Sequence, residues 1–322
     1  MSEKLYKASV VLCCWSLMIV VLVATPSFAE LPSGDSTIRG KVGNSEIVIR
    51  TTSRLAGAVD SLTWKGKEFI NSFDHGRQLQ SAANFDVGTR FTGETFNPTE
   101  AGSRNDGDGN TSTSRLLHLL ASENRLQTTT QMAFWLLPGQ DSSGNLAKNK
   151  QALSNHLLTK RITIGYQDMP HVIQHNVTFS MPLGEHHNYA QFEAVTGYMP
   201  PEFSEFWKFN PLTSMLEPLS DGPGEQAWPV VLSTKDQQFA MGVYSPQQPS
   251  KGYEIAGYGR FRFPAAKVVK WNSVFRIRNP KGVPAGDYRF KNFVIVGTLE
   301  TVRVTIKRLR SMASTTKTTQ SN

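Results

Sequence analysis

The stretch GAVDSLTWKGKEFINSFDHGRQLQSAANFDVGTRFTGETFNPTEAGS, residues 57–103, carries most of what this sequence says about its fold. Apolar and polar residues alternate in short runs, which is typical of β-strands that bury one face. Glycines and a proline separate the runs and predict turns. Polar side chains gather between these turns, and loops on a rigid β scaffold often carry function. The stretch therefore predicts a β fold with a polar site beside its strands.

The rest of the chain continues the strand pattern. Residues 37–42 and 46–51 flank Gly43-Asn44 and predict a hairpin, and residues 58–64 and 67–70 predict a second one. Further strands are predicted over 115–121, 125–136, 157–166, 172–181, 189–196, 230–233, 239–244, 259–263, 268–278 and 288–297. Apolar residues at helical spacing between 299 and 309 predict one short helix. We therefore predict an all-β fold, a large antiparallel β-sandwich with one short C-terminal helix.

The first 29 residues predict an export signal. Lys4 and Lys7 precede an uncharged apolar run, and Ser27-Phe28-Ala29 supplies the small residues of a cleavage site. The run is about 17 residues, the lower limit for a transmembrane span. We expect a removed signal (1–29), a single sandwich domain (30–310) and a disordered tail (311–322). The protein would then be periplasmic or secreted, with no stable membrane span after removal of the signal.

Composition excludes several functional classes. Both cysteines, Cys13 and Cys14, lie in the signal, so the mature chain has no disulfide, thiolate metal site or cysteine nucleophile. The formal charge of +8 is dispersed, without the basic stripe and interleaved aromatics of a nucleic-acid binder. Motifs of serine esterases, nucleotide-binding loops and zincins are missing from the sequence. We expect no cofactor and no nucleic-acid partner.

The turn Asp74-His75-Gly76-Arg77 is the first candidate site. His75 can pass a proton near neutral pH, and the planar fork of Arg77 suits a hydroxyl or a carboxylate. A tight turn held by an Asp74–Arg77 salt bridge is the alternative interpretation. On a strand, alternation would place His75 and Arg77 on one face and Gln80 on the other.

Asn97 and Glu100 form the second candidate, together with Glu94. Two carboxylates can act as acid and base in glycoside hydrolysis, which needs about 5–5.5 Å between them for retention and roughly 6.5–9.5 Å for inversion. The alternative is a structural turn in which Asn97, before Pro98, bonds to the backbone. Glu100 is a candidate catalytic residue and Asn97 a candidate ligand contact.

The third candidate is a polar stripe along one predicted strand. Period two places His187, Tyr189, Gln191 and Glu193 on one face, with Ala190, Phe192 and Ala194 on the core face. Such a stripe offers hydrogen bonds and an aromatic ring to a sugar, although an ordinary solvated face has the same pattern. Glu193 is the candidate acid or base of this strand.

Aromatic residues are concentrated in the irregular segment 197–228. They either stack on sugar rings or cap the end of the sandwich, and Trp207 is the candidate ligand contact among them. Two further patterns offer potential metal ligands, but neither predicts a metal site. His171 and His175 share a face with apolar residues, and Asp106–Asn110 lacks the glycine and the glutamate of a calcium loop. We predict no metal site.

One part of the opening stretch resembles a known family. Gly57-Ala58-Val59-Asp60-Ser61-Leu62, followed by Gly66-Lys67-Glu68, resembles the start of the galactose-mutarotase-like proteins. The resemblance implies a β-supersandwich that handles carbohydrate on a concave sheet face. Members include aldose epimerases, and related sandwiches occur in glycoside hydrolases and polysaccharide lyases. The acid and base of the mutarotases are not placed on residues of this chain.

These observations lead to two functional hypotheses. The first is an exported enzyme that acts on a sugar or polysaccharide as a hydrolase, lyase or epimerase, with His75, Glu100 and Glu193 as catalytic groups. Its substrate would be held by Arg77, Asn97, His187, Tyr189, Gln191 and Trp207. The alternative is a carbohydrate-binding or envelope structural protein without catalysis. An enzyme requires titratable groups that converge in one cleft.

Overall fold

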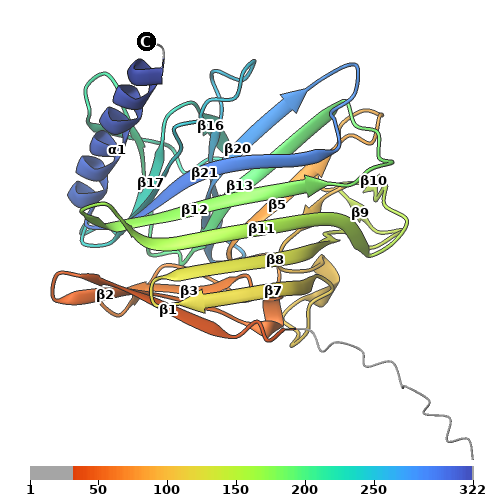
Figure 1. Cartoon of the computed structure of the whole chain (residues 1–322), viewed down its shortest axis with the longest axis horizontal. Helices are drawn as coiled ribbons and strands as arrows, with labels where there is room; N and C mark the ends of the chain where they lie inside the picture. Colours follow the sequence, from red (N-terminus) through yellow and green to blue (C-terminus); the bar gives the residue numbers. More distant parts are fainter. Residues whose placement is uncertain (1–31, 321–322) are drawn as a thin grey trace, which may run out of the picture. The chain divides into compact units, whose positions relative to one another are not determined.

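The structure is a computed structural model that describes residues 32–320, all within one compact unit spanning residues 31–322. The predicted export signal lies outside the described residues and stays a prediction. Antiparallel strands form two ladders that run through the molecule (Figure 1). The all-β fold class and the single C-terminal helix are thus confirmed for the described residues.

The first ladder, here called the β12 ladder, has nine strands. Its order follows from the strand pairings. From one edge to the other it consists of β7 (Arg115–Ser122), β8 (Arg125–Phe134), β11 (Leu153–Tyr166), β12 (Met169–Met181), β21 (Gly286–Gly297), β18 (Ala240–Tyr244), β17 (Val230–Ser233), β14 (Glu205–Phe209) and β15 (Leu216–Pro218).

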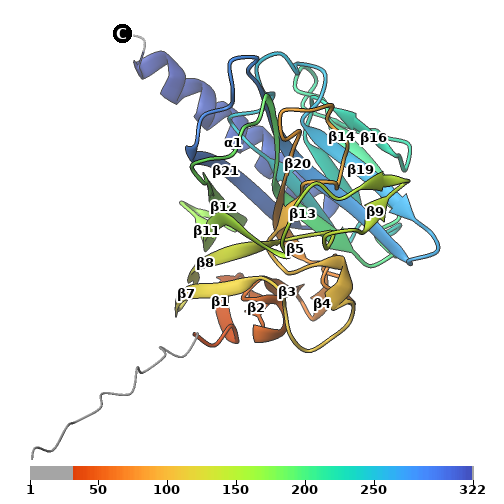
Figure 2. The same ribbon diagram turned by 90° about the vertical axis from the view of Figure 1, so that its right-hand side faces the viewer.

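The second ladder, the β13 ladder, has eight strands and lies beside the first (Figure 2). It consists of β1 (Ser36–Val42), β2 (Ser45–Thr51), β3 (Val59–Trp64), β5 (Leu79–Phe85), β13 (Tyr189–Met199), β20 (Val268–Arg278), β19 (Tyr258–Phe263) and β16 (Gly224–Gln226). The short strand β6 (Pro98–Thr99) pairs with both β5 and β8 and so joins the two ladders. Strand β4 (Lys67–Glu68) pairs with β3, and β9 (Asp141–Ser142) pairs with β10 (Asn145–Leu146).

Both predicted hairpins form, because their turns supply residues that tolerate a left-handed backbone. Gly43 has φ 58° between β1 and β2, and Lys65 and Gly66 have φ 50° and 74° between β3 and β4. The segment 197–228 was expected to be irregular, yet it contains three short strands, β14, β15 and β16. Those strands have three to five residues each, too few for an alternation pattern to show.

The core lies between the ladders. Trp271 of β20 is fully buried there with Leu62 of β3 and Ile173 of β12. Its ring needs the glycine beside it, since a Cβ on Gly197 would lie 2.6 Å from the indole. A second cluster of aromatic residues, centred on Phe85, Phe179 and Phe192, continues the core toward the other end.

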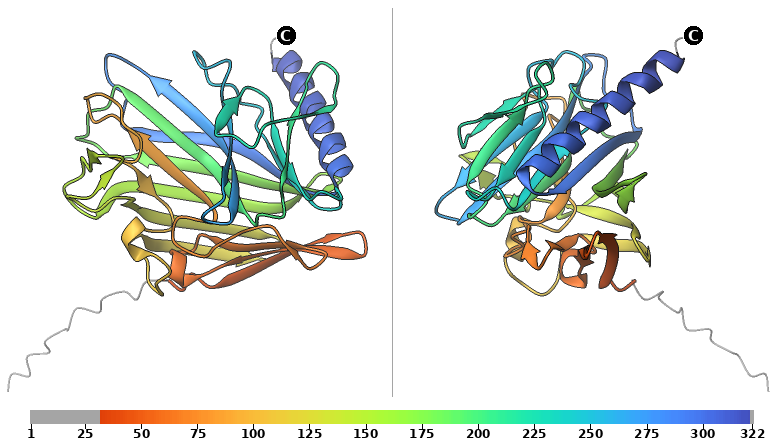
Figure 3. Two further views of the ribbon diagram at one scale, coloured as in Figure 1. Left: turned by 180° about the vertical axis from the view of Figure 1, so that it is seen from behind. Right: turned by 90° about the vertical axis from the view of Figure 1, so that its left-hand side faces the viewer.

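Helix α1 (Leu299–Gln320) lies across the outer face of the β12 ladder (Figure 3). Val302 and Ile306 are fully buried against Val231 and Ile295, which point away from the core between the ladders. The helix comes close to β18 at Gly242, where a Cβ would lie 2.9 Å from Val302 Cγ1. Strands β17 and β18, and β21 from Asn292 onward, are therefore buried on both faces.

The helix is longer than predicted. Its backbone is helical to Gln320, whereas the sequence predicts a short helix with apolar residues between 299 and 309; the expected disorder of residues 311–322 stays a prediction. The predicted helix rests on apolar residues that can be buried, and the last of these lies near residue 312. Long stretches of Ser, Thr and Lys can still extend a helix that is already nucleated, because propagation is easier than nucleation. Within residues 32–320, no helix is both long and apolar enough to cross a membrane.

The packing of α1 generates a stability prediction. Ile306→Ala removes a fully buried side chain beneath the helix and should lower the free energy of unfolding by about 2–5 kcal/mol. Val304→Ala is the matched control, because Val304 is 47% exposed on the same helix and its loss should cost within about 0.5 kcal/mol. Urea denaturation measures both; equal effects would contradict the docking of α1.

Candidate functional site

A cavity of about 110 Å³ opens on the face of β5, β13 and β20 that points away from the core. Strand alternation creates it: Ala83 and Phe85 of β5 enter the core, so Gln80, Ala82 and Asn84 face the other way. The small side chain of Ala82 leaves space between its polar neighbours. The cavity is lined by Gly76, Gln80, Ala82, Asn84, Glu94, Asn97, Thr99, Trp135, Glu193, Thr196, Tyr198 and Lys270.

An ion pair forms the floor of the cavity. Glu193 Oε2 lies 3.2 Å from Lys270 Nζ on the neighbouring strand. The same oxygen accepts hydrogen bonds from Asn272 Nδ2 at 3.2 Å and Thr196 Oγ1 at 2.9 Å. Residues 193 and 196 share a face only because the pairing register of β13 shifts just after Glu193. Such an irregularity adds a residue to one strand and re-aims its side chains.

These contacts keep the pair ionised. Burial raises the pKa of the Glu193 carboxyl, but the Lys270 charge and the bonds from Asn272 and Thr196 outweigh it and hold that pKa below its usual value. Burial lowers the pKa of Lys270. Interactions with the Glu193 carboxylate and with Tyr198 outweigh burial, so the pKa of Lys270 is raised overall. Burial also raises the pKa of the Tyr198 hydroxyl. At neutral pH the floor therefore carries a carboxylate, an ammonium and a protonated phenol.

Glu94 lies exposed at the mouth of the cavity, in an unusual backbone conformation. Its φ of 66° is in the left-handed region that non-glycine residues seldom occupy. Two bonds hold it there: its N–H donates to Asn84 Oδ1 at 2.9 Å, and Ser142 Oγ donates to its Oε2 at 2.6 Å. Backbone strain of this kind is often found at functional sites.

Two aromatic side chains line the cavity. Tyr198 lies beside Lys270, whose Nζ is 5.1 Å from the ring centroid. Trp135 lies against Gly76, where an added Cβ would come within 2.8 Å of the indole Cη2. The glycine of the Asp74–Arg77 turn is therefore needed to let Trp135 reach the cavity wall.

The three predicted catalytic residues do not meet in one site. His75 is 1% exposed, and its two ring nitrogens lie 2.8 Å from the carbonyl oxygens of Gly107 and Arg54. Glu100 is fully buried, where one oxygen pairs with Lys160 and the other accepts the Ser81 N–H at 3.0 Å. Of the three, Glu193 alone lines the cavity. The polar atoms of His75 and Glu100 are bonded to buried groups elsewhere in the fold.

The predicted binding residues are also dispersed. Asn97 lines the cavity and donates from Nδ2 to Ala83 O. Arg77 points elsewhere, pairing with Asp74 at 3.2 Å and donating to Ala266 O at 3.2 Å, so the alternative salt-bridged turn is the one observed. Trp207 packs beside the α1 cluster and donates from Nε1 to Ser233 Oγ at 3.0 Å.

The polar stripe on β13 forms in part. Ala190, Phe192 and Ala194 are fully buried, as expected for the core face. Tyr189 and Gln191 are on the opposite face and bond to each other at 3.2 Å, but they do not line the cavity. His187 precedes the strand and turns into the core, where its Nε2 lies 2.8 Å from Glu185 Oε2.

Several residues that line the cavity are not among the predicted site residues. Lys270 is the most informative, because Lys270 and Asn272 alternate with the buried Val269 and Trp271 along β20. That period-two pattern was available in the sequence and marks a polar face. Tyr198 belongs to the aromatic segment 197–228, which the sequence offers as stacking platforms for sugar rings. Trp135 carries no comparable signal, since an aromatic residue in a strand is most often part of a core.

Comparisons with known proteins give structural likenesses but no sequence relative. No family model matches the chain, and no curated protein matches it. Among solved structures, the α-galactosidase AgaB of Geobacillus stearothermophilus is 9% identical, with a TM-score of 0.41 over 84% of this chain and 41% of that one. An α-mannosidase of Enterococcus faecalis V583 is 11% identical, with a TM-score of 0.45 over 84% of this chain and 32% of its own.

A third likeness covers a whole protein. The Slr1438 protein of Synechocystis sp. PCC 6803 is 10% identical, with a TM-score of 0.45 over 85% of this chain and 100% of that chain. The chain spans less than half of the two glycosidases. The fold class itself rests on the strand pairings of this chain.

The Glu193 pair predicts a pH-dependent contribution to stability. Because the folded state lowers the pKa of Glu193, its contribution is complete above the unfolded value near 4.5 and disappears as the pH falls through the folded value. Glu193→Gln should therefore be destabilising by about 1–3 kcal/mol at pH 7. The difference from the original chain should shrink in acid below pH about 4.5. Urea unfolding at a series of pH values measures it; a difference independent of pH would contradict the assignment.

Proposed function

We propose that the protein binds a carbohydrate in the cavity between β5, β13 and β20. The observation that carries the proposal is the make-up of the lining. An indole ring, a phenol, three amides, two threonine hydroxyls and a fixed ion pair surround a single small space. Sugars present both hydroxyls, which donate and accept, and an apolar face that packs on aromatic rings. A pocket with few, well-placed polar groups beside aromatic side chains fits this chemistry.

The polar groups are positioned before any ligand arrives. Gln80 and Asn84 are each 6% exposed, and Gln80 Nε2 donates to Gly76 O at 3.0 Å. Gln80 Oε1 has no hydrogen-bond partner among the described residues, so an acceptor remains for a ligand hydroxyl. Groups already held in place lose little conformational entropy on binding, and this favours affinity.

The size of the cavity favours one sugar ring. Its volume of about 110 Å³ corresponds to on the order of ten water-sized spheres. A cavity of about 150 Å³ holds a benzene ring, so this one takes part of a single sugar ring, with the rest of that ring and any further residues of a glycan beyond the mouth at Glu94. The proposed ligand is therefore a monosaccharide or the end of a chain.

Binding can be tested with the purified chain and a panel of neutral and acidic monosaccharides, followed by calorimetry and tryptophan fluorescence. Gly76→Ala should displace the Trp135 indole from the cavity wall, and Glu193→Gln should remove the negative charge of the ion pair. We expect each to weaken binding at least tenfold, about 1.4 kcal/mol.

Glu202→Gln is the matched control. Glu202 is 46% exposed, pairs with Lys67 and lies outside the cavity, so its loss should leave affinity unchanged. If no sugar on the panel binds the original chain in a saturable way, the proposed function fails.

Acid/base catalysis on the bound sugar is a second candidate, favoured by one specific observation. Glu193 and Glu94 line the same cavity in contrasting surroundings, one paired with a cation and the other exposed at the mouth. Two carboxylates in different environments are the arrangement that separates an acid from a base. Glu94 here replaces His75 and Glu100 as the partner of Glu193.

Catalysis is tested on whichever sugar binds, with anomeric proton NMR for epimerisation and reducing-end release for hydrolysis. Removal of one acid/base group should lower turnover by about 10²–10⁴-fold in Glu94→Gln or Glu193→Gln. Glu202→Gln should turn over like the original chain. If the original chain binds a sugar in a saturable way but does not turn it over, the catalytic function is rejected and the binding function is supported.

A further inference from the structure

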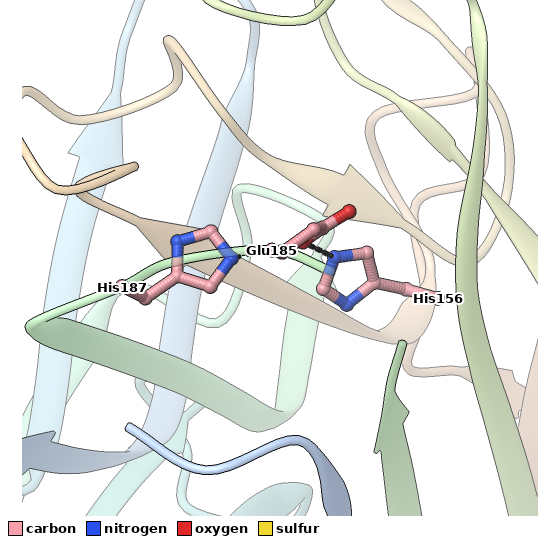
Figure 4. A group of neighbouring side chains, drawn as sticks. All are labelled: His156, Glu185 and His187. Carbon is pink, nitrogen blue, oxygen red and sulfur yellow. Dashed lines mark hydrogen bonds and ion pairs between the residues drawn. The ribbon is translucent and has the colours of Figure 1, made fainter. Parts of the chain in front are cut away.

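Three potential metal ligands meet at the other end of the sandwich, on the opposite face of β5 from the cavity. The Nε2 atoms of His156 and His187 each lie 2.8 Å from the same oxygen, Glu185 Oε2. All three ligand atoms are within 4.8 Å of one another. Figure 4 shows the two imidazole rings on either side of the carboxylate, with their nitrogens turned toward it.

The three residues come from two segments that are themselves held in place. His156 is on β11, at the irregular stretch where pairing with β8 is interrupted between Leu153 and Leu157. Glu185 and His187 are in the loop between β12 and β13. Val283 N–H donates to His187 O at 2.6 Å, and the next residue, Asn188, donates to Asp86 Oδ1 at 2.9 Å.

Aromatic packing fixes both rings. His156 stacks on Phe85 with centroids 4.9 Å apart, and His187 packs on the same ring at 4.6 Å. Phe96 contacts both imidazoles from another side, at 6.2 Å and 5.6 Å. Both histidines are at most 2% exposed, while the side chain of Glu185 is 22% exposed. The cluster is therefore rigid on the histidine side and open to solvent beside the carboxylate.

The spacing is close to that of a coordinated ion. Zn²⁺ holds nitrogen and oxygen ligands at about 2.0–2.2 Å, so two ligands at a tetrahedral angle are about 3.4 Å apart. Each ligand atom needs to move by about 1 Å or less to reach that geometry. Glu185 is able to supply this movement, since it is the exposed member and its Oε1 accepts no hydrogen bond from the described residues.

The protons can also rearrange. An imidazole binds a metal through a nitrogen lone pair, so each histidine must carry its proton on Nδ1 when Nε2 is a ligand. Nδ1 of His187 has no hydrogen-bond partner in the described structure, so it can take the proton without displacing another bond, and the bond from Nε2–H to Glu185 would be replaced by the bond to the metal. The carboxylate brings a negative charge to two neutral ligands, and this favours a cation.

We propose that His156, Glu185 and His187 bind a divalent transition-metal ion such as Zn²⁺. Two imidazoles and one carboxylate are a ligand set of zinc and of related ions. The fourth position faces solvent beside Glu185, where water or a small ligand completes the coordination. This site is independent of the cavity, because Phe85 and Asn84 are neighbours on β5 and point to opposite faces.

The site is tested first on the full chain without mutation. After treatment with a chelator, Zn²⁺ is titrated in competition with a chromophoric chelator, and Co²⁺ is added separately to record its visible absorption. We expect one ion per chain, a dissociation constant in the micromolar range or below, and a Co²⁺ spectrum of low coordination number. An original chain that takes up neither ion overturns the proposal.

Variants then assign the ligands. Glu185→Gln and His156→Gln should each weaken Zn²⁺ binding about 100-fold or more, beyond what loss of a supporting bond causes, and abolish the Co²⁺ spectrum. His186→Ala is the matched control, because His186 is exposed in the same loop and is not a member of the cluster. Loss of binding in His186→Ala, with unchanged binding in Glu185→Gln, would overturn the assignment in favour of a surface histidine.

Discussion

A fully buried ion pair ties the two ladders together. Lys160 of β11 and Glu100 have no exposed side-chain surface, and the second oxygen of Glu100 accepts the backbone N–H of Ser81 in β5. An unpaired charge in this interior would cost several kcal/mol, so neither partner can leave without the other. The neighbouring His175 is held neutral, since burial and the Lys160 charge lower its pKa to about 3. The position of β5 relative to β11 depends on this contact.

From that fixed position, β5 divides the polar chemistry of the molecule between two faces. Gln80 and Asn84 line the cavity, whereas Ser81 and Phe85 face the interior. Strand β13 pairs with β5, so its side chains alternate between the same two faces: Phe192 enters the core and Glu193 enters the cavity. Strand β20 repeats it with Trp271 and Lys270. The cavity is thus a consequence of alternation on three adjacent strands.

The sequence predicts the features that depend on local pattern. Hairpins at Gly43 and Gly66 and the core face of β13 follow from turn chemistry and period two, and the structure contains them. Features that depend on partners distant in sequence could not be predicted from the local pattern. Glu100 is an ordinary loop carboxylate until Lys160, 60 positions later, is placed against it. His75 is likewise an ordinary histidine until Gly107 and Arg54 bring their carbonyl groups to its ring.

His187 shows why alternation needs a known strand boundary. Period two places it on the face of Glu193 only if the strand includes residue 187, but β13 begins at Tyr189. Two residues outside the strand, the chain is free to turn, and His187 enters the opposite face. Asp86, next to Phe85, accepts the N–H of Asn188 and so anchors this turn to the end of β5. The end of β5 therefore supports both places. Asn84 bonds to Glu94 at the mouth of the cavity, and the next two residues, Phe85 and Asp86, position the histidine cluster. Because the two lie on opposite faces of the sheet, each presents its own set of groups to its own ligand.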